Sequence, residues 1–280
     1  MADALAMQHK VCVVTGASSG LGRAIAAGLA RQGATVVLAC RDMARGAAAQ
    51  AHIQAASGNP NIELMQLDLA VQASVRAFAE EYRARHSRLN VLVHNAGVLV
   101  SRRTLTPDGL ETMFATNHLG PFLLTQLLLD SLKAGALARI VTVTGPASTS
   151  LHLDNLQSEV MFHTVDAFAA ARLCSQLCSL ELARQLDGRG VTINLINPGL
   201  VRTNLLREAP APVRWVWRLA AASPERAAQP VVRLASSREL AGVTGRIFKR
   251  RREIEPLRAA RDPNLRRAVW ETSMRLAGLE

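Results

Sequence analysis

The chain has 280 residues, of which 49% are hydrophobic, and its 33 basic and 22 acidic side chains give a formal net charge of +11. This composition is typical of a soluble globular protein and excludes disordered and collagen-like classes. The apolar run Phe122 to Leu132 is interrupted by Thr125, Gln126 and Asp130, so we expect no membrane-spanning helix. Met1 to Lys10 lacks the pattern of a secretory signal, which favours a cytoplasmic protein.

Two residue types are scarce. Lys10, Lys133 and Lys249 stand against 30 arginines, and Tyr82 is the only tyrosine. A mechanism that needs a tyrosine acid with a lysine a few residues away therefore has almost no place in this chain.

The positive charge is concentrated towards the carboxyl end. Residues 201–280 hold 17 basic and 8 acidic side chains (+9), with the densest run at Lys249 to Arg252. Such a run can bind nucleic acid. Because the whole chain is rich in Arg and poor in Lys, we attribute it to the base composition of the gene and expect no nucleic-acid partner.

The predicted elements alternate along the chain. Short β-branched or Leu-rich segments predict strands at Val11 to Thr15, Thr35 to Ala39, Ile62 to Leu67, Val91 to His94, Ile140 to Thr144 and Val191 to Ile196. Helical spacing of apolar residues predicts helices at Leu21 to Gln32, Met43 to Ala56, Gln72 to His86, Leu110 to Leu132 and Val165 to Leu186. This order predicts an α/β fold: a Rossmann-type, doubly wound parallel sheet with helices on both faces, in a single domain spanning 1–280.

Several details complete this prediction. Gly33, Gly135 and the segment 188–190 are expected to end helices in a left-handed conformation. Residues 200–225 look like a lid over the carboxyl edge of the sheet, Gly242 to Phe248 a last strand, and 246–280 a basic C-terminal extension. The four cysteines are predicted to pack as small apolar groups, without zinc or a disulfide: Cys12, Cys40, Cys174 and Cys178.

A glycine-rich turn, Thr15 to Gly22, joins the first predicted strand directly to the first predicted helix. Glycines in this position allow a tight turn and let backbone amides approach a pyrophosphate, and the helix N-terminus favours the anion. Because strand, turn, helix and second strand follow in the expected order, the sequence predicts a dinucleotide site here.

The spacing G-x-x-x-G-x-G in this turn resembles the short-chain dehydrogenase/reductase family. The resemblance extends to Leu67-Asp68-Leu69, His94-Asn95-Ala96-Gly97, Asn117-His118-Leu119-Gly120 and Asn197-Pro198-Gly199, and thus covers nearly the whole chain. Segments 117–120, 156–159 and 270–273 look most like the retinol-dehydrogenase-like branch.

The resemblance implies a role for each matching residue. The phosphates would be held by Gly16, Ser18, Ser19, Gly20 and Leu21, the adenine by Asp68 and Leu69, the adenosine-side ribose by Asn95, Ala96 and Gly97, and the nicotinamide amide by Pro198, Gly199 and Thr203. NAD enzymes place a carboxylate at the end of the second strand, whereas this chain has Cys40 followed by Arg41, whose guanidinium suits a 2′-phosphate. We therefore expect NADP(H) in preference to NAD(H).

The family's catalytic pattern fails in this chain. The resemblance places Gly145 where the family has Ser, Phe168 where it has the Tyr acid, and Arg172 where it has Lys. Phe168 keeps the ring without the hydroxyl, and Arg172 keeps a cation that can bond the ribose but cannot tune a neighbour as a lysine does. Loss of a general acid costs ~10²–10⁴ in rate, so we expect weak or absent carbonyl reduction.

Other residues are candidates for the missing chemistry. Asn117 and Arg172 are the catalytic residues that the resemblance leaves, and Ser148, His152 and His163 are candidate substitute acids or bases, together with Thr144, Asp154 and Asp166. Asp166 is also expected to cap the following helix. Gly145 and Phe168, roofed by Trp215, would form a roomy apolar substrate pocket, and no metal is expected.

Three functions stay open at this point. The chain is a diverged oxidoreductase acting on a small apolar molecule such as an iminium or polarised C=C acceptor, a non-redox isomerase, cyclase or dehydratase, or a non-catalytic cofactor-binding protein. The family resemblance also implies a homodimer or homotetramer paired through the helices at Leu110 to Leu132 and Val165 to Leu186.

Overall fold

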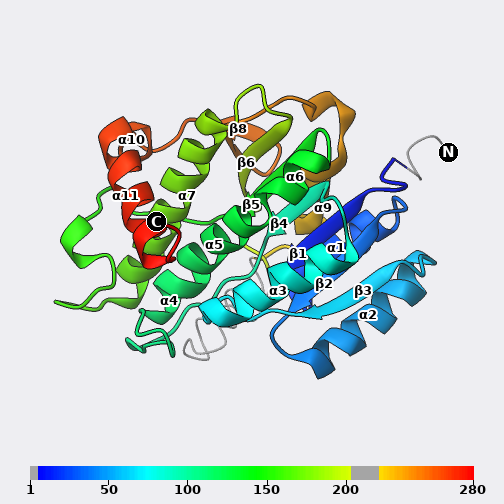
Figure 1. Cartoon of the computed structure of the whole chain (residues 1–280), viewed down its shortest axis with the longest axis horizontal. Helices are drawn as coiled ribbons and strands as arrows, with labels where there is room; N and C mark the ends of the chain where they lie inside the picture. The colour runs from blue at the N-terminus through cyan, green and yellow to red at the C-terminus, as the bar shows by residue number, and fades with distance from the viewer. Residues whose placement is uncertain (1–5, 203–220) are drawn as a thin grey trace.

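Eight strands form a single sheet in the computed structural model, which describes residues 6–202 and 221–280 (Figure 1). The strands are β1 (Val11–Thr15), β2 (Thr35–Cys40), β3 (Ile62–Gln66), β4 (Val91–His94), β5 (Ala138–Val143), β6 (Val191–Asn197), β7 (Arg246–Lys249) and β8 (Arg252–Ile254). Their order is β3-β2-β1-β4-β5-β6-β7-β8, with every pair parallel except β7 and β8. The predicted doubly wound sheet is confirmed, and its order reverses between β1 and β4, the position at which such sheets bind ligands.

Helices cover both faces of the sheet. One face packs against α1 (Gly20–Ala30), α2 (Met43–Ser57) and α9 (Pro224–Ser236), and the other against α3 (Gln72–Arg85), α5 (Gly120–Leu127), α6 (Leu129–Ala134) and α7 (Thr164–Gln185). Successive side chains of a strand point to opposite faces, so Cys12 and Val14 join the first core and Val13 the second.

The six strands predicted from the sequence are all present, with ends shifted by at most two residues. The predicted last strand is β7, and β8, which was not predicted, pairs antiparallel with it. β8 has only three residues, all exposed, so it carries no alternation of buried and exposed positions that a sequence pattern would reveal.

The single helix predicted at Leu110 to Leu132 is wrong in detail. The segment instead forms α4 (Thr112–Phe114), the π-helix η1 (Ala115–Leu119), α5 and α6. Pro121 at the start of α5 has no amide hydrogen, so the helical hydrogen bond to the carbonyl four residues earlier is lost, and the wider π-turn lies just before it.

Gly135 also differs from the prediction. Its backbone is right-handed (φ −71°), whereas Gly33, Gly188 and Gly190 have the expected positive φ. A Cβ at Gly135 would lie 2.0 Å from the carbonyl oxygen of Leu89. Glycine is therefore required here by the close approach of another backbone and not by a left-handed turn.

The carboxyl-terminal part of the chain folds onto this body. After the short helices η4 (Arg238–Leu240) and α10 (Arg258–Arg261), helix α11 (Pro263–Leu276) lies beside α7, at the left of Figure 1. Asp262 caps α11 by accepting from the amides of Asn264 and Leu265, and Trp270 meets the ring of Phe122 on α5 edge-on at 5.0 Å.

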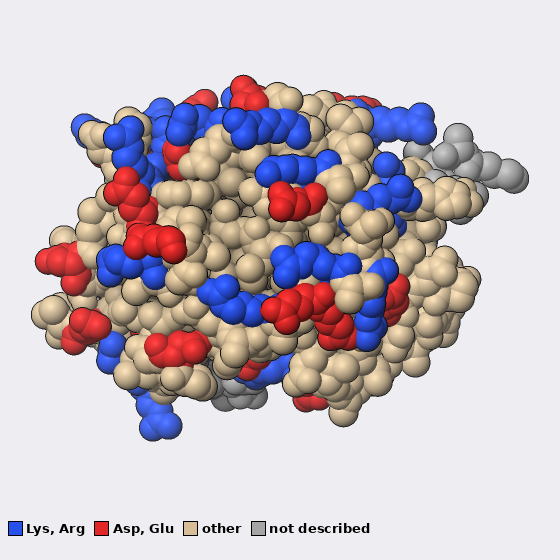
Figure 2. Space-filling model, viewed as in Figure 1, with Lys and Arg blue, Asp and Glu red and all other residues tan. Residues whose placement is uncertain are grey.

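The basic side chains are dispersed. Figure 2 shows Lys and Arg interspersed with Asp and Glu on the face that it presents. Two arginines of the carboxyl-terminal region lie near acidic partners, Arg246 with Glu253 at 3.2 Å and Arg261 with Glu255 at 3.8 Å. Within the described ranges, no helix is long and apolar enough to cross a membrane.

All four cysteines are buried as free thiols. Burial raises the pKa of Cys12 to about 12 and that of Cys40 to about 11, so neither forms a thiolate readily. Cys174 and Cys178 lie in the core between α7 and its neighbours, where they fill space as the sequence predicts.

Candidate cofactor and active site

The glycine-rich turn runs from the end of β1 into the first turn of α1. Gly16 and Gly20 have positive φ values of 66° and 53°. A Cβ at Gly16 would lie 3.0 Å from the Cα of Ala96, and one at Gly22 would lie 2.4 Å from both the Gly16 carbonyl oxygen and Nδ2 of Asn95. The turn therefore passes close to the segment that follows β4, which a side chain would prevent.

Hydrogen bonds hold these two segments together. Thr15 Oγ1 accepts from the amides of Asn95 and Ala96, at 3.0 and 3.1 Å, and Asn95 Nδ2 donates to the Thr15 carbonyl oxygen at 2.9 Å. Ser19 occupies the N-cap of α1 without a capping side-chain bond, so the first amides of the helix are free to meet an anion. The residues present thus fit a dinucleotide, and Gly16, Ser18, Ser19, Gly20 and Leu21 all lie in this cradle.

Two arginines approach the cradle from β2 and α2. Arg41 follows β2 directly, and its side chain is exposed and therefore accessible to a phosphate group. Arg45, in the first turn of α2, donates from Nη2 to Ser19 Oγ at 3.3 Å. We did not predict Arg45. Arg45 lies four residues after Arg41, in the first turn of the helix that starts at Met43, and this spacing is the sequence pattern that could have indicated it.

Asp68 and Leu69 lie just beyond β3, in a loop that is fixed by its own hydrogen bonds. Asp68 accepts from the amide of Ala70 at 3.0 Å, and its own amide donates to Ser74 Oγ at 2.9 Å. Leu69 is buried, and its carbonyl oxygen would lie 2.2 Å from a Cβ on Gly120. Both residues are held at the sheet edge where the resemblance places the adenine.

Three residues from distant parts of the sequence meet at the predicted chemical end. The nearest atom to a Cβ built on Gly145 is Cε1 of Phe168, at 3.9 Å. The guanidinium carbon of Arg172 lies 5.0 Å from the centre of the Phe168 ring, one helical turn away on α7. The structure therefore brings Gly145, Phe168 and Arg172 together, as their alignment with the family's Ser, Tyr and Lys requires.

Arg172 is buried, with 7% of its surface exposed. Its Nη1 donates to the carbonyl oxygen of Val143 at 3.2 Å, and its Nη2 would lie 2.5 Å from a Cβ on Gly97. Nε has no partner in the part of the chain that the structure describes, and burial lowers the pKa of the guanidinium to about 10, which leaves it charged at neutral pH. Neither Val143 nor Gly97, nor the ring of Phe168, offers a negative charge.

Asn117 reaches the same place from the π-helix η1. Its Oδ1 accepts from the amide of Val98 at 2.8 Å and its Nδ2 donates to the carbonyl of Val98 at 2.9 Å. The side chain thus closes the loop after Gly97. Its neighbour His118 donates from Nε2 to Ser273 Oγ at 2.9 Å, since that hydroxyl donates its own hydrogen to the Val269 carbonyl. No pattern in the sequence indicated that α11 supports this turn.

The candidate substitute acids lie in different surroundings. Ser148 is half-buried, and its amide donates to the carbonyl of Ala169, next to Phe168. His152 and His163 are exposed. The N-cap of α7 is His163, not Asp166 as predicted, because the helix begins at Thr164 and Asp166 lies within its first turn. Of Ser148, His152 and His163, Ser148 is the one whose backbone is bonded to the turn of α7 that carries Phe168.

Thr144, considered as a hydroxyl near the vacant Ser position, is buried and accepts a long hydrogen bond of 3.4 Å from Gln176. Asp154 lies exposed in the short helix η2 (Leu153–Asn155).

The nicotinamide end of the predicted site is described only in part. Pro198 is buried, and Gly199 has a φ of 86°, with Arg250 from the β7–β8 turn 3.1 Å from the position of an added Cβ. The basic run is thus the tight turn of a hairpin that packs on this segment. Thr203, Trp215 and most of the lid expected at 200–225 lie outside the described residues.

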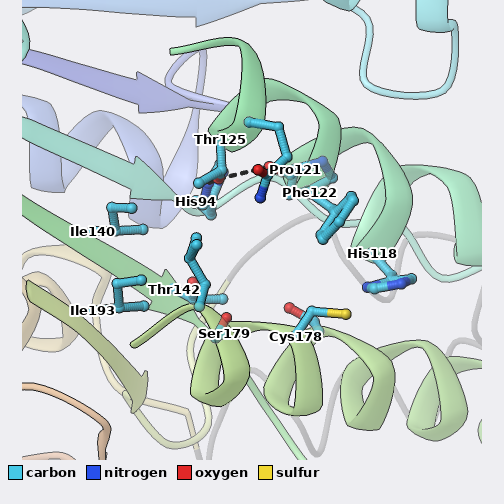
Figure 3. Close-up of a pocket in the computed structure, with 13 residues that line it drawn as sticks. His94, His118, Pro121, Phe122, Thr125, Ile140, Thr142, Cys178, Ser179 and Ile193 are labelled. Carbon is cyan, nitrogen blue, oxygen red and sulfur yellow. Dashed lines mark hydrogen bonds between the residues drawn. The ribbon is translucent and has the colours of Figure 1, made fainter. Parts of the chain in front are cut away.

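A small cavity of about 30 Å³ lies between β4, β5 and the helices α5 and α7 (Figure 3). His94 donates from Nε2 to Thr125 Oγ1 at 2.7 Å, because that hydroxyl donates to the Pro121 carbonyl. Burial lowers the pKa of His94 to about 4. The cavity has room for a water molecule and not for a substrate, so it is not the active site.

Apolar side chains pack around Phe168, which is buried. They form one cluster with it: Val98, Leu99, Val100, Met113, Phe162 and Ala167. The loops that contribute them are joined, since Arg103 donates to the Gln157 carbonyl and the amide of Glu111 donates to Gln157 Oε1, both at 3.0 Å. This end of the sheet therefore offers an apolar wall beside a buried cation.

Comparisons with known proteins agree with this arrangement. The family model of short chain dehydrogenases matches residues 10–213. The chain is 39% identical to human (Homo sapiens) retinol dehydrogenase 13, over 97% of this chain and 85% of that protein, and 40% identical to mouse (Mus musculus) polyprenol dehydrogenase, over 96% and 84%. A crystal structure of an uncharacterised protein from Mycobacterium paratuberculosis superposes with a TM-score of 0.79 at 30% identity, covering 100% of this chain and 97% of that one.

The sheet order and the glycine-rich cradle define a Rossmann-type α/β protein. The chain belongs to the short-chain dehydrogenase/reductase family, a family of oxidoreductases, and within it to the retinol-dehydrogenase-like branch.

Proposed function

We propose that this protein is an NADP(H)-dependent oxidoreductase that acts on a small, mainly apolar molecule without the tyrosine acid of its family. The observation that carries this proposal is the pairing of an intact dinucleotide cradle with Phe168 beside Gly145. A bound nicotinamide cofactor supplies or accepts hydride. The cradle keeps that chemistry available, while Phe168 has no hydroxyl with which to exchange a proton.

The cofactor preference rests on Arg41 and Arg45. Both cations belong to the segment after β2, where a 2′-phosphate would lie, and Arg45 already bonds Ser19 of the phosphate turn. A carboxylate that would bind a ribose 2′-hydroxyl is missing at the end of β2, since Asp42 is used as the N-cap of α2 and accepts from the amide of Arg45. The local charge therefore favours NADP(H).

The apolar character of the substrate rests on the cluster around Phe168 and on its rim. Five large hydrophobic residues in the loops beside the cluster, in η2 and in the first turn of α7 are exposed: Leu105, Leu153, Val160, Met161 and Val165. Val160 and Met161 expose 87% and 67% of their surface. The relatives named above act, by their names, on retinol and polyprenol, which are themselves apolar alcohols. An apolar substrate fits such a wall.

A non-redox activity is the second candidate, and the same Phe168 and Arg172 favour it, because an isomerase or dehydratase could use the pocket with the cofactor as a fixed element. Loss of catalysis altogether is the third. The homodimer or homotetramer, the cytoplasmic location, the absence of a nucleic-acid partner and the roles of Ser148 and Thr203 stay predictions.

Isothermal titration with NADPH and NADH tests the cofactor proposal. Charge-assisted hydrogen bonds contribute about 1.5–3 kcal/mol, so we expect NADPH to bind roughly 10- to 100-fold more tightly than NADH. Arg41→Ala and Arg45→Ala should each weaken NADPH binding and leave NADH binding unchanged. Arg31→Ala, at the far end of α1, is the matched control. Equal or tighter binding of NADH by the unchanged protein would contradict the proposed preference for NADP(H).

A further inference from the structure

Arg172 is a buried cation without a counter-charge. It forms no ion pair with any residue in 6–202 or 221–280, and the groups around it, Val143, Gly97, Asn117 and the Phe168 ring, are uncharged. Desolvation is what shifts its pKa, and no neighbouring charge contributes to that shift. Buried charges in proteins are normally paired. A cation left in this state at a candidate active site indicates that the negative partner arrives with the ligand.

The guanidinium also has donors to spare. Among residues 6–202 and 221–280, Nε finds no hydrogen-bond partner, and the side chain makes a single bond, from Nη1 to the Val143 carbonyl. Its position over the Phe168 ring places it beside the apolar wall that is expected to contact the substrate. The neutral hydroxyls of a cofactor ribose can accept some of these hydrogens but cannot neutralise the charge.

We propose that Arg172 is an oxyanion-binding residue, and that the site takes an uncharged acceptor with a C=C bond conjugated to a carbonyl, an enone or enal, while it rejects cationic acceptors such as iminium ions. This proposal rests on the proposed function. It selects one of the two acceptors that do not need the tyrosine acid, the polarised C=C bond, over the other, the iminium ion.

The chemistry of an enone suits the groups present. Addition of hydride to its β-carbon forms a C–H bond, the C=C electron pair shifts to make the enolate, and the negative charge lies on the carbonyl oxygen. A proton from water then adds to the α-carbon. The enolate charge is spread over oxygen and carbon, so it is a much weaker base than the alkoxide formed from a ketone. A fixed cation can stabilise it without an acid in the position of Phe168.

An iminium acceptor reverses the electrostatics. It is positive before the reaction, when it would lie beside the uncompensated charge of Arg172, and it becomes neutral afterwards. Two like charges about 5 Å apart in a partly buried site repel strongly enough to weaken binding tenfold or more. The same cation that favours a developing enolate therefore excludes the iminium ion.

A phenol that ionises in the site tests this without turnover. We would bind 4-nitrophenol to the protein loaded with NADP⁺ and follow its ionisation by absorbance. An opposite charge within about 4–6 Å lowers an acid's pKa by about 1–3 units, so the pKa of the bound phenol should fall by that amount. Arg172→Met should abolish the fall and Arg172→Lys should restore part of it. Arg139→Met removes another partly buried arginine that bonds a backbone carbonyl, and it should change nothing.

A cationic probe gives the converse result. Benzyltrimethylammonium should bind the Arg172→Met variant at least about tenfold more tightly than the unchanged protein. Circular dichroism and NADP⁺ titration establish that each variant is folded and loaded. An unshifted phenol pKa in the unchanged protein, or a shift that persists in Arg172→Met, overturns the proposal. If the pKa of the bound phenol falls but no hydride is transferred to any acceptor, the oxyanion site stands and the redox function is refuted. The two failures are therefore distinguishable.

Discussion

At the scale of single residues, the resemblance implies that the candidate site departs from its family by small changes with large chemical effects. Phe168 lacks one oxygen atom, Gly145 lacks a hydroxymethyl group, and Arg172 carries a guanidinium in place of an ammonium. The packing around them is ordinary: an added Cβ at Gly145 would meet Phe168 at a normal contact distance of 3.9 Å. Nothing in the backbone here prevents the family's residues from being put back.

Restoring the three residues should therefore restore carbonyl reduction. We expect Gly145→Ser, Phe168→Tyr and Arg172→Lys together to raise the rate of ketone reduction by ~10²–10⁴ over the unchanged protein, which is the contribution of a general acid. The measurement is NADPH consumption with an apolar ketone. The matched control is the double variant Gly145→Ser and Arg172→Lys, which lacks the hydroxyl and should stay inactive. A triple variant that binds NADPH but gains no activity would show that more than the acid has been lost.

At the scale of elements, α11 links the helices α3, α5, η1 and α7 on one face of the sheet. Val269, Ser273 and Ala277 are its buried stripe, with helical spacing. Beyond the contacts with α5 and η1, Gln72 donates to the carbonyl oxygen of Leu276 at 2.9 Å, and Arg76 donates to that of Ala277 at 2.6 Å. These bonds from α3 satisfy carbonyls at the end of α11, and the cation complements its dipole.

This helix lies on the face through which the resemblance predicts subunit pairing. Its Trp270 and Ser273 contact Phe122, His118 and Cys178, which belong to the two segments expected to meet a partner. Pairing through this part of the face would have to displace α11.

A disulfide trap tests whether α11 packs on its own chain. Ser273 Oγ lies 3.6 Å from Cys178 Sγ, so mild oxidation of Ser273→Cys should link the new thiol to Cys178. We expect a product that runs as one chain of 30.1 kDa on a non-reducing gel, with the link identified by mass spectrometry. Glu271→Cys, exposed on the same helix, is the control and should not link to Cys178. A covalent dimer through Cys178 would show instead that α11 is exchanged between chains.

At the scale of the whole molecule, the sequence predicted the sheet and its strands β1 to β6, and it placed the candidate site residues just after them. These depend on local signals: β-branched runs, the glycine-rich turn, and residues placed just after a strand. The break at Pro121, the constraint on Gly135 and the support of His118 by Ser273 could not be predicted, since each depends on a neighbour distant in sequence. Arg45 lies between these cases, because its spacing was visible but its contact with Ser19 was not.

Two buried histidines tie the stability of the whole fold to pH. Burial lowers the pKa of His94 to about 4 and that of His118 to about 3, below their usual value of 6.5. The unfolded chain therefore takes up protons below pH ~6.5 that the folded chain does not. The stability that each neutral histidine contributes is full above that pH and is lost as the pH falls towards the folded value. For His94 it is on the order of 3 kcal/mol.

Urea unfolding at a series of pH values measures this effect. We expect the free energy of unfolding to fall between pH ~6.5 and ~4.5, and His118→Gln to reduce that slope. Burial raises the pKa of Glu111, which changes stability with pH in the opposite direction. The informative quantity is therefore the difference in slope between the unchanged protein and His118→Gln. If both show the same slope, His118 does not titrate in the way its burial implies.

The central claim is that the protein keeps a hydride-transfer site and lacks the acid that ketone reduction needs. The most direct test incubates the protein with NADPH deuterated at nicotinamide C4 and a matched apolar enone and ketone, and measures deuterium in the products by mass spectrometry. We predict deuterium at the β-carbon of the enone product, with transfer to the ketone slower by ~100-fold or more. Ketone labelled as fast as enone, or no deuterium in either product, would contradict this account.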